Sequence, residues 1–218
     1  MQRAAIKLGK TKGRPNWLLR LPGEWDEKVL SAAFAAFAAK GFDGATIGEI
    51  AAAAGVSKRT LYERYADKAD LFRALLAWGC RGNLATEPPA SDIDAETALV
   101  RHAEAVLSAV MRPESIELAR IVIGAAPRFP ELARLFDDMT RTASLKIVKG
   151  LAARLAAEKR IAADPDRFAA DFIGLLRSDG WHRALLGVAP PLAQTKVRSE
   201  ARRAIAALIA AHAPRRHV

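Results

Sequence analysis

The sequence contains little cysteine and few aromatic residues. Its single cysteine, Cys80, excludes an internal disulfide and is compatible with a reducing compartment. Aromatic residues make up only 6% of the 218 residues. The apolar residues are instead mostly alanine and leucine, with few runs of β-branched residues. This composition favours helices along almost the whole chain.

Long apolar runs are also missing. No window approaches the roughly 18 uninterrupted apolar residues that a membrane span requires. The first 20 residues lack the continuous apolar segment of a signal peptide. We therefore expect a cytoplasmic protein that does not contact a membrane.

Acidic residues are absent from the first 20 positions, which carry six lysines and arginines. The whole chain has a formal net charge of +10, which indicates an anionic partner or a generally basic surface. Glycine and proline interrupt this basic segment. Residues 1–22 are therefore predicted to form a flexible arm that reaches a DNA backbone or minor groove.

The residue patterns of common catalytic and metal sites are missing too. The histidines show no metal-ligand spacing with each other or with Cys80, and no glycine-rich phosphate loop follows a strand. His102 and Glu104 would lie about 200° apart on a helix, which does not suit joint acid–base catalysis. An enzyme is the main rival class, but the sequence predicts no catalysis, no metal and no cofactor.

The sequence does contain clear helix signals near its start. Leu30, Phe34 and Phe37 form one apolar stripe over residues 24–40. Gly41 is placed to end that helix. Thr46 and Glu49 then form a capping box that starts a short second helix.

Signals for the starts of two further helices follow at short intervals. Gly55 supplies a turn, and Ser57 is a suitable N-cap for a third helix that runs to about Arg64. Asp67 and Asp70 repeat the capping pattern for a fourth helix. Two short helices joined by a glycine-containing turn are what a helix-turn-helix requires.

The polar residues of this stretch suit DNA contact. In a helix-turn-helix, the first residues of the second helix contact base edges. Lys58 and Arg59 suit guanine or phosphate, and Thr60 suits a base or a thymine methyl group. The full predicted DNA-binding set is Thr46, Ser57, Lys58, Arg59, Thr60, Tyr62, Arg64 and Lys68. The alternative is a set of ordinary capped helices with solvated charges.

Residues 24–75 resemble the DNA-binding domain of the TetR family of bacterial transcriptional regulators. The resemblance is carried by Gly41-Phe42, Thr46, Ile50-Ala51, Ala54 to Ser57, Thr60 to Tyr62, Tyr65, Lys68 and Leu71. It implies that the third helix enters the major groove and that Thr46, Tyr62 and Lys68 contact the DNA backbone. Tyr65 replaces the usual phenylalanine. Glu63 is an unusual acid, which either accepts from a cytosine amino group or points to solvent.

The stretch from Thr86 to Asp92 is the best candidate for a domain boundary. We predict an arm at 1–22, a DNA-binding domain at 23–83 and a larger helical domain at 84–218, giving an all-α protein. In this third region we expect helices at roughly 93–111, 114–125, 128–139, 142–160, 165–187 and 192–212. Residues 128–132 and the helices after them resemble the C-terminal domain of one TetR subgroup.

The family resemblance implies that the last two long helices build a dimer, which operator half-sites also require. The predicted contacts are Phe168, Phe172, Leu175, Leu176, Ile205, Leu208 and Ile209. The alternative is that these apolar residues of both helices belong to the internal core of one chain.

The resemblance also implies a cavity for a small apolar effector in the C-terminal domain. Arg177 and Trp181 share a helix face and are the candidate ligand residues, although core or dimer packing is the more common role of such a pair. The predicted function is a repressor that binds a pseudo-palindromic operator as a homodimer and is released by the effector. A DNA-binding protein without a ligand is a further alternative.

Overall fold

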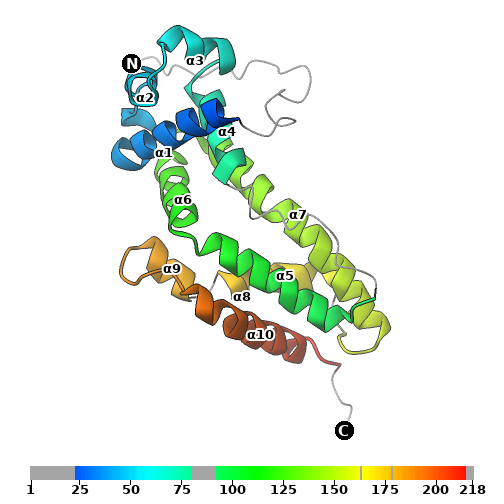
Figure 1. Ribbon diagram of the computed structural model, residues 1–218. Helices are drawn as coiled ribbons and strands as arrows, with labels where there is room; N and C mark the ends of the chain where they lie inside the picture. Colours follow the sequence, from blue (N-terminus) through cyan, green and yellow to red (C-terminus); the bar gives the residue numbers. More distant parts are fainter. Residues whose placement is uncertain (1–22, 80–91, 163, 178, 215–218) are drawn as a thin grey trace.

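The computed structural model describes residues 23–79, 92–162, 164–177 and 179–214, which are helical and contain no strand (Figure 1). The helices are α1 (Glu24–Gly44), α2 (Ile47–Ala54), α3 (Lys58–Arg64), α4 (Lys68–Gly79), α5 (Ala95–Val110), α6 (Pro113–Ala125), α7 (Pro130–Ala157), α8 (Pro165–Leu176), α9 (Asp179–Leu185) and α10 (Gln194–Ala211). The predicted all-α class is confirmed. The predicted arm at 1–22 and most of the predicted boundary segment lie outside the described residues.

Helix α1 ends its regular part at Gly41, as predicted. Gly41 has a φ of 68° and a ψ of 174°, so the helix breaks there before a last short turn. Positive φ is strained for residues with a Cβ, which explains why glycine occupies the position. The break turns Phe42 into the core, where its ring is buried.

Helix α7 corrects the prediction of two helices at 128–139 and 142–160. It is one continuous helix of 28 residues. Thr140 lies where we expected the interruption, but its hydroxyl donates to the Phe136 carbonyl at 2.8 Å. The polar side chain is thus satisfied within the helix and does not end it.

The opposite correction applies to the helix predicted at 165–187. It divides into α8 and α9, because Arg177 leaves the helical conformation with a φ of −86° and a ψ of 43°. The dipeptide Asp179-Gly180 follows this break, and Asp-Gly is a turn signal that the prediction of one helix did not use. Gly187, with a φ of 72°, then leads the chain away from α9.

Two apolar cores hold the helices together. One joins α1 to α4 with α6 and the first part of α7, and includes Phe37, Phe72 and Leu132. The other joins α5, the second part of α7, α8 and α10, and includes Leu155 and Phe168. Helix α7 runs from the helix-turn-helix end towards the far end of the molecule (Figure 1) and belongs to both cores.

Candidate nucleic-acid interface and sensing cavity

The start of α2 is fixed by the predicted capping box. The Thr46 hydroxyl accepts from the Glu49 backbone amide at 3.2 Å, and the Glu49 carboxylate accepts from the Thr46 amide at 3.1 Å. The lowered pKa of Glu49 follows from its hydrogen bonds to Lys40 and then to Thr46. Helix α2 ends at Gly55, whose φ of 65° and ψ of 35° are left-handed. This turn sets the direction in which α3 leaves α2.

Helix α3 is anchored on one side and exposed on the other. The Ser57 hydroxyl caps it by accepting from the Thr60 amide at 3.0 Å. Leu61 and Tyr65 are buried beneath it, whereas Tyr62 is 54% exposed. Lys58 and Arg59 are exposed and Thr60 is partly so. The first residues of α3 therefore face solvent at one end of the molecule, as groove entry requires (Figure 1).

Two exposed basic side chains at this tip contact other parts of the chain, and one of them is in an ion pair. Arg59 Nε lies 2.9 Å from Glu63 Oε1, although their side chains are 87% and 61% exposed. The Lys58 side chain folds back over Gly48, where a Cβ would lie only 2.6 Å from Lys58 Cε. Glu63 thus reaches solvent and holds Arg59 in an exposed ion pair.

Arg64 has a structural partner that the sequence did not reveal. Its Nε and Nη2 each donate to the Asp26 carboxylate at 3.1 Å, and the Tyr65 hydroxyl donates to the same group at 3.3 Å. Burial and then the charge of Asp26 raise the pKa of Tyr65 to about 12. The guanidinium thus ties α3 to α1. Its predicted phosphate contact stays a prediction, and one that must compete with Asp26.

Lys68 is similarly engaged. Its Nζ donates to the Asp43 carbonyl at 3.1 Å and to the Ala45 carbonyl at 3.0 Å. It also lies over the Phe42 ring. Burial lowers the pKa of Lys68, and Asp43 opposes this shift. One of the three ammonium protons stays available for a phosphate.

The helix-turn-helix is joined directly to the C-terminal helices. The rings of Phe42 and Phe129 meet edge to face with centroids 4.7 Å apart. Arg128, in the turn between α6 and α7, forms an ion pair with Asp43. Sequence reasoning left Arg128 without a role, because its partner is 85 positions away. The contact connects this turn to the end of α1 beside Lys68.

Helix α6 also holds α9. Arg120 Nη2 donates to the Ala184 carbonyl at 2.7 Å, and Arg120 Nε donates to the Leu185 carbonyl at 2.8 Å. These are the last carbonyls of a short helix, which an arginine satisfies well. A displacement of α9 would therefore be transmitted to α6.

The two predicted ligand residues lie together. The Arg177 guanidinium stands over the Trp181 ring, 5.5 Å from its centroid. Both line a cavity between α4, α6, α7 and α9, with free space of about 30 Å³. The other residues that line this cavity are Gly79, Val110, Ser115, Leu118, Ala119, Phe136 and Thr140.

The predicted dimer contacts require a correction. Phe168, Phe172, Leu176, Ile205 and Leu208 are each at most 2% exposed within one chain. They form its internal core, so these side chains are not available to a second copy. Ile209 is half-buried against the same core, and only Leu175 is exposed, at 39%.

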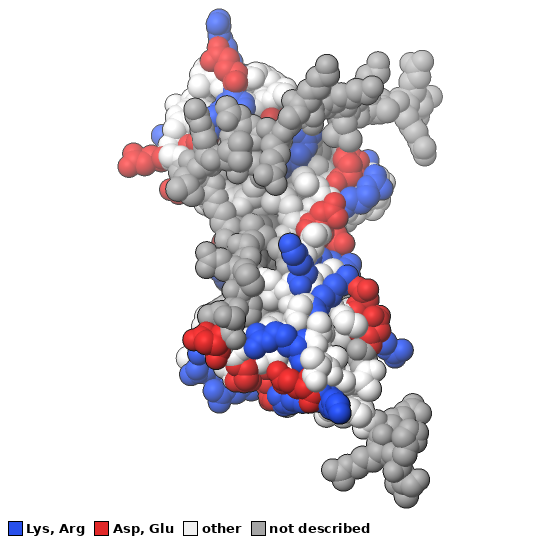
Figure 2. All heavy atoms as spheres, turned by 90° about the vertical axis from the view of Figure 1, so that its right-hand side faces the viewer, with Lys and Arg blue, Asp and Glu red and all other residues white. Residues whose placement is uncertain are grey.

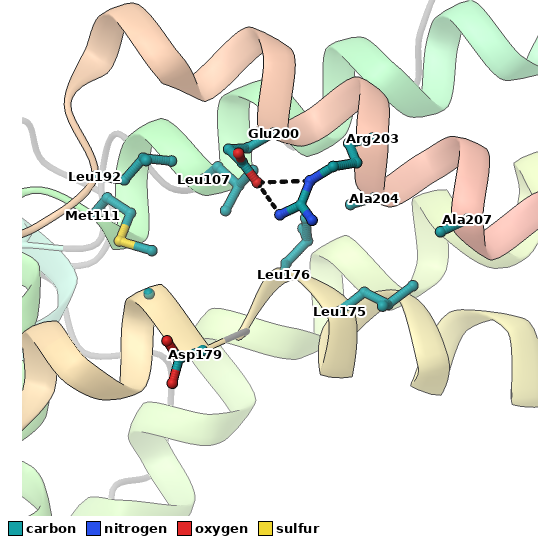
Figure 3. A pocket seen from close by; sticks show the side chains of 11 residues that line it. Leu107, Met111, Leu175, Leu176, Asp179, Leu192, Glu200, Arg203, Ala204 and Ala207 are labelled. Carbon is teal, nitrogen blue, oxygen red and sulfur yellow. Dashed lines mark hydrogen bonds and ion pairs between the residues drawn. The ribbon is translucent and has the colours of Figure 1, made fainter.

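A larger hollow of about 430 Å³ lies beside Leu175, between α5, α8, α9 and α10. Figure 3 shows Leu107 and Met111 of α5 facing Leu175 and Leu176 across it. The ion pair of Glu200 and Arg203 lines the α10 side.

One face of the C-terminal half carries mixed surface charge. On the face seen in Figure 2, lysines and arginines alternate with aspartates and glutamates over this half. Such a mixed pattern produces no broad patch of one sign on this face. Within the described ranges, no group of three or more His, Cys, Asp or Glu residues is arranged to hold a metal ion, and no helix is long and apolar enough to cross a membrane.

Two family models match the chain. Residues 29–75 match the model described as bacterial regulatory proteins of the tetR family. Residues 97–214 match the model described as the C-terminal domain of AefR-like transcriptional repressors. No match was found among the curated proteins.

Several solved structures have the same fold. A TetR-family protein from Mesorhizobium loti MAFF303099 is 27% identical, with 87% of this chain and 97% of that chain covered and a TM-score of 0.71. The flavonoid-responsive regulator FrrA is also 27% identical, with 89% and 100% covered and a TM-score of 0.71. A regulator from Agrobacterium tumefaciens shares the fold at 24% identity, with 88% and 96% covered and a TM-score of 0.72.

The helix-turn-helix and the helical domain behind it define a transcriptional regulator. The two family matches cover most of the chain, in the same order as its two predicted domains. The chain belongs to the TetR family of bacterial transcriptional regulators.

Proposed function

We propose that the chain is a repressor that binds a pseudo-palindromic operator as a homodimer and is released by a small, mostly apolar effector. The observation that carries the proposal is the exposed start of α3, where Lys58 and Arg59 face solvent while Leu61 is buried. The description of the C-terminal family model as that of a repressor supports the direction of control. The proposal assigns the chain no catalytic reaction.

DNA recognition is assigned to α3 and to the helix starts beside it. Arg59, Lys58 and Thr60 read bases or nearby phosphates, while Thr46, Ser57, Tyr62, Arg64 and Lys68 contact the backbone. The test is fluorescence anisotropy with the intergenic DNA that flanks the gene. The double variant Lys58→Ala, Arg59→Ala should lose specific binding, whereas the control Arg101→Ala, Lys146→Ala removes two exposed charges elsewhere and should retain it. Equal losses would refute the assignment.

Dimerisation is assigned to the exposed faces of α8 and α10 around the hollow of Figure 3. Half-sites lie about 34–36 Å apart, so two α3 helices must be held at that spacing. Leu175 borders the hollow and offers apolar area that a second copy would bury. In sedimentation, Leu175→Asp should give a monomer, while Ala35→Asp, on an exposed position of α1, should not. A dimeric Leu175→Asp variant would contradict this interface.

Release is assigned to a movement of α9 that Arg120 transmits to α6 and the Phe42–Phe129 contact transmits to α1. A ligand acts only through its different affinities for the two states. The similar regulator FrrA is described as flavonoid-responsive, so a protein of this fold responds to an aromatic molecule. Arg120→Met should bind an effector normally but release operator DNA only at higher effector concentration. An unchanged release curve would exclude this route.

A further inference from the structure

The Arg177 guanidinium has no hydrogen bond or ion pair with any residue that the structure describes, although it is half-buried. Most other arginines of the helical domain that face the interior have carbonyl or carboxylate partners, as Arg120 and Arg141 do. A guanidinium carries five donors. None of the Arg177 nitrogens is among the fully buried atoms that lack a partner, so they can be reached from outside the chain. Arg177 therefore stands ready to receive an acceptor from outside the chain.

The charges around Arg177 leave an excess of one positive charge. Burial lowers the pKa of Arg177, Asp137 opposes the shift and Arg141 adds to it. The Asp137 carboxylate is already 3.3 Å from Arg141, in an ion pair on α7. The one carboxylate near Arg177 is thus already paired with Arg141, so a single negative charge would balance Arg177.

The stacking of Arg177 on Trp181 leaves the guanidinium edge free. A planar guanidinium uses its face to stack and its edge to form two parallel hydrogen bonds to a carboxylate. The cavity beside it is lined by the rings of Phe136 and Trp181 and by the aliphatic side chains of Leu118 and Val110. Flat apolar walls next to one cation suit an aromatic molecule that bears one acidic group.

We propose that the effector of this chain is a monoanionic aromatic acid, whose carboxylate binds Arg177 and whose ring packs between Trp181 and Phe136. This inference rests on the proposed ligand-responsive function. The free space of about 30 Å³ is smaller than an aromatic ring, so Trp181 and α9 must move when the acid enters. The hydroxyl groups of Ser115 and Thr140 line the same cavity and offer further polar contacts.

The test compares two probes of nearly equal shape, 2-naphthoate and its neutral amide 2-naphthamide, by isothermal titration calorimetry on the full chain. The acid should bind about tenfold more tightly or better, because a bidentate charged pair is lost with the amide. In Arg177→Met, which keeps the apolar stem, both probes should bind equally. Arg101→Met removes an exposed arginine of α5 and should preserve the difference.

Equal binding of both probes by the unaltered chain, or no binding of the acid, would overturn the inference, as would a preference that survives Arg177→Met. Arg177→Lys keeps the charge but not the planar edge, and should retain only part of the preference; it replaces Arg177→Met if that variant does not fold. Operator binding without any probe is measured on the same samples. A loss of operator binding in the absence of any probe would count against the proposed function. If operator binding is intact, the probe results decide only the chemical class of the ligand.

Discussion

The Lys68 Nζ lies 4.8 Å from the centroid of the Phe42 ring, just past the end of the regular part of α1. The ring beneath it also contacts Phe129 from the C-terminal helices. A residue expected to contact DNA thus takes part in the junction between the two halves of the chain.

Lys68→Ala is expected to act on both stability and DNA binding. It removes two hydrogen bonds to carbonyls and a cation–π contact, which should lower the free energy of unfolding by about 1–2 kcal/mol. It should also weaken all DNA sequences alike and reduce the salt slope of binding by roughly one. Urea unfolding and salt titrations measure the two effects. An unchanged slope with lost stability would make Lys68 purely structural.

Arg59→Ala is expected to cost about 1–3 kcal/mol at one operator position. A uniform loss over all operator variants would instead assign Arg59 to phosphate. The partner variant Glu63→Gln removes the competing carboxylate 2.9 Å from Arg59 and one negative charge facing DNA. Glu63→Gln should tighten DNA binding. Fluorescence anisotropy at several salt concentrations measures the operator affinity of both variants. Weaker binding of Glu63→Gln would indicate that Glu63 itself contacts a base.

Asp26 and Arg64 are expected to stabilise the fold as a pair. Asp26→Asn or Arg64→Ala should each lower the free energy of unfolding by about 1–3 kcal/mol, because each leaves a half-buried charge without its partner. The double variant should cost less than the sum of the two. Glu27→Gln, an exposed neighbour, is the control. Strict additivity in denaturant unfolding would show that the two groups do not interact.

His102 is expected to make stability depend on pH. It is 7% exposed, stacks on Phe172 and bonds Ser144, and burial lowers its pKa from 6.5 to about 4. Between these two values the unfolded chain binds a proton that the folded chain does not. The free energy of unfolding should therefore fall by about 3 kcal/mol as pH decreases from 6.5 to 4, then level off.

His102→Gln supplies the background from all other groups for that experiment. Urea unfolding at several pH values should show a shallower decline for the variant than for the unaltered chain. Parallel curves would mean that His102 titrates normally in the folded state.

The N-terminal helices were predictable because their signals are local. Thr46 with Glu49, Gly55 and Ser57 each act within four residues, and each was found in the predicted role. The partners of Arg64, Lys68 and Arg128 are 23 to 85 positions away, and periodicity carries no information about them.

The C-terminal half was harder to predict from the sequence, for a related reason. An apolar stripe predicts burial but does not say whether the covering surface belongs to the same chain. Phe168 and Ile205 are covered by their own chain, while Leu175 on the same helix as Phe168 is not. The break after Arg177 does have a local signal in Asp179-Gly180, but the apolar periodicity on both sides favoured one helix. The spacing of Arg177 and Trp181 predicted that they lie together, whereas their placement on either side of a break between two helices comes from the structure.

The continuity of α7 has a consequence for exchanging parts between related regulators. Leu118, Val122 and Leu132, from α6 and α7, complete the core around Phe42 and Phe72. A fragment ending near residue 83 would lack this wall and expose those rings to water. A chimera that joins the DNA-binding domain of this protein to the C-terminal domain of another family member would therefore also need the α6 and α7 residues that pack against it. A chimera without these residues should aggregate.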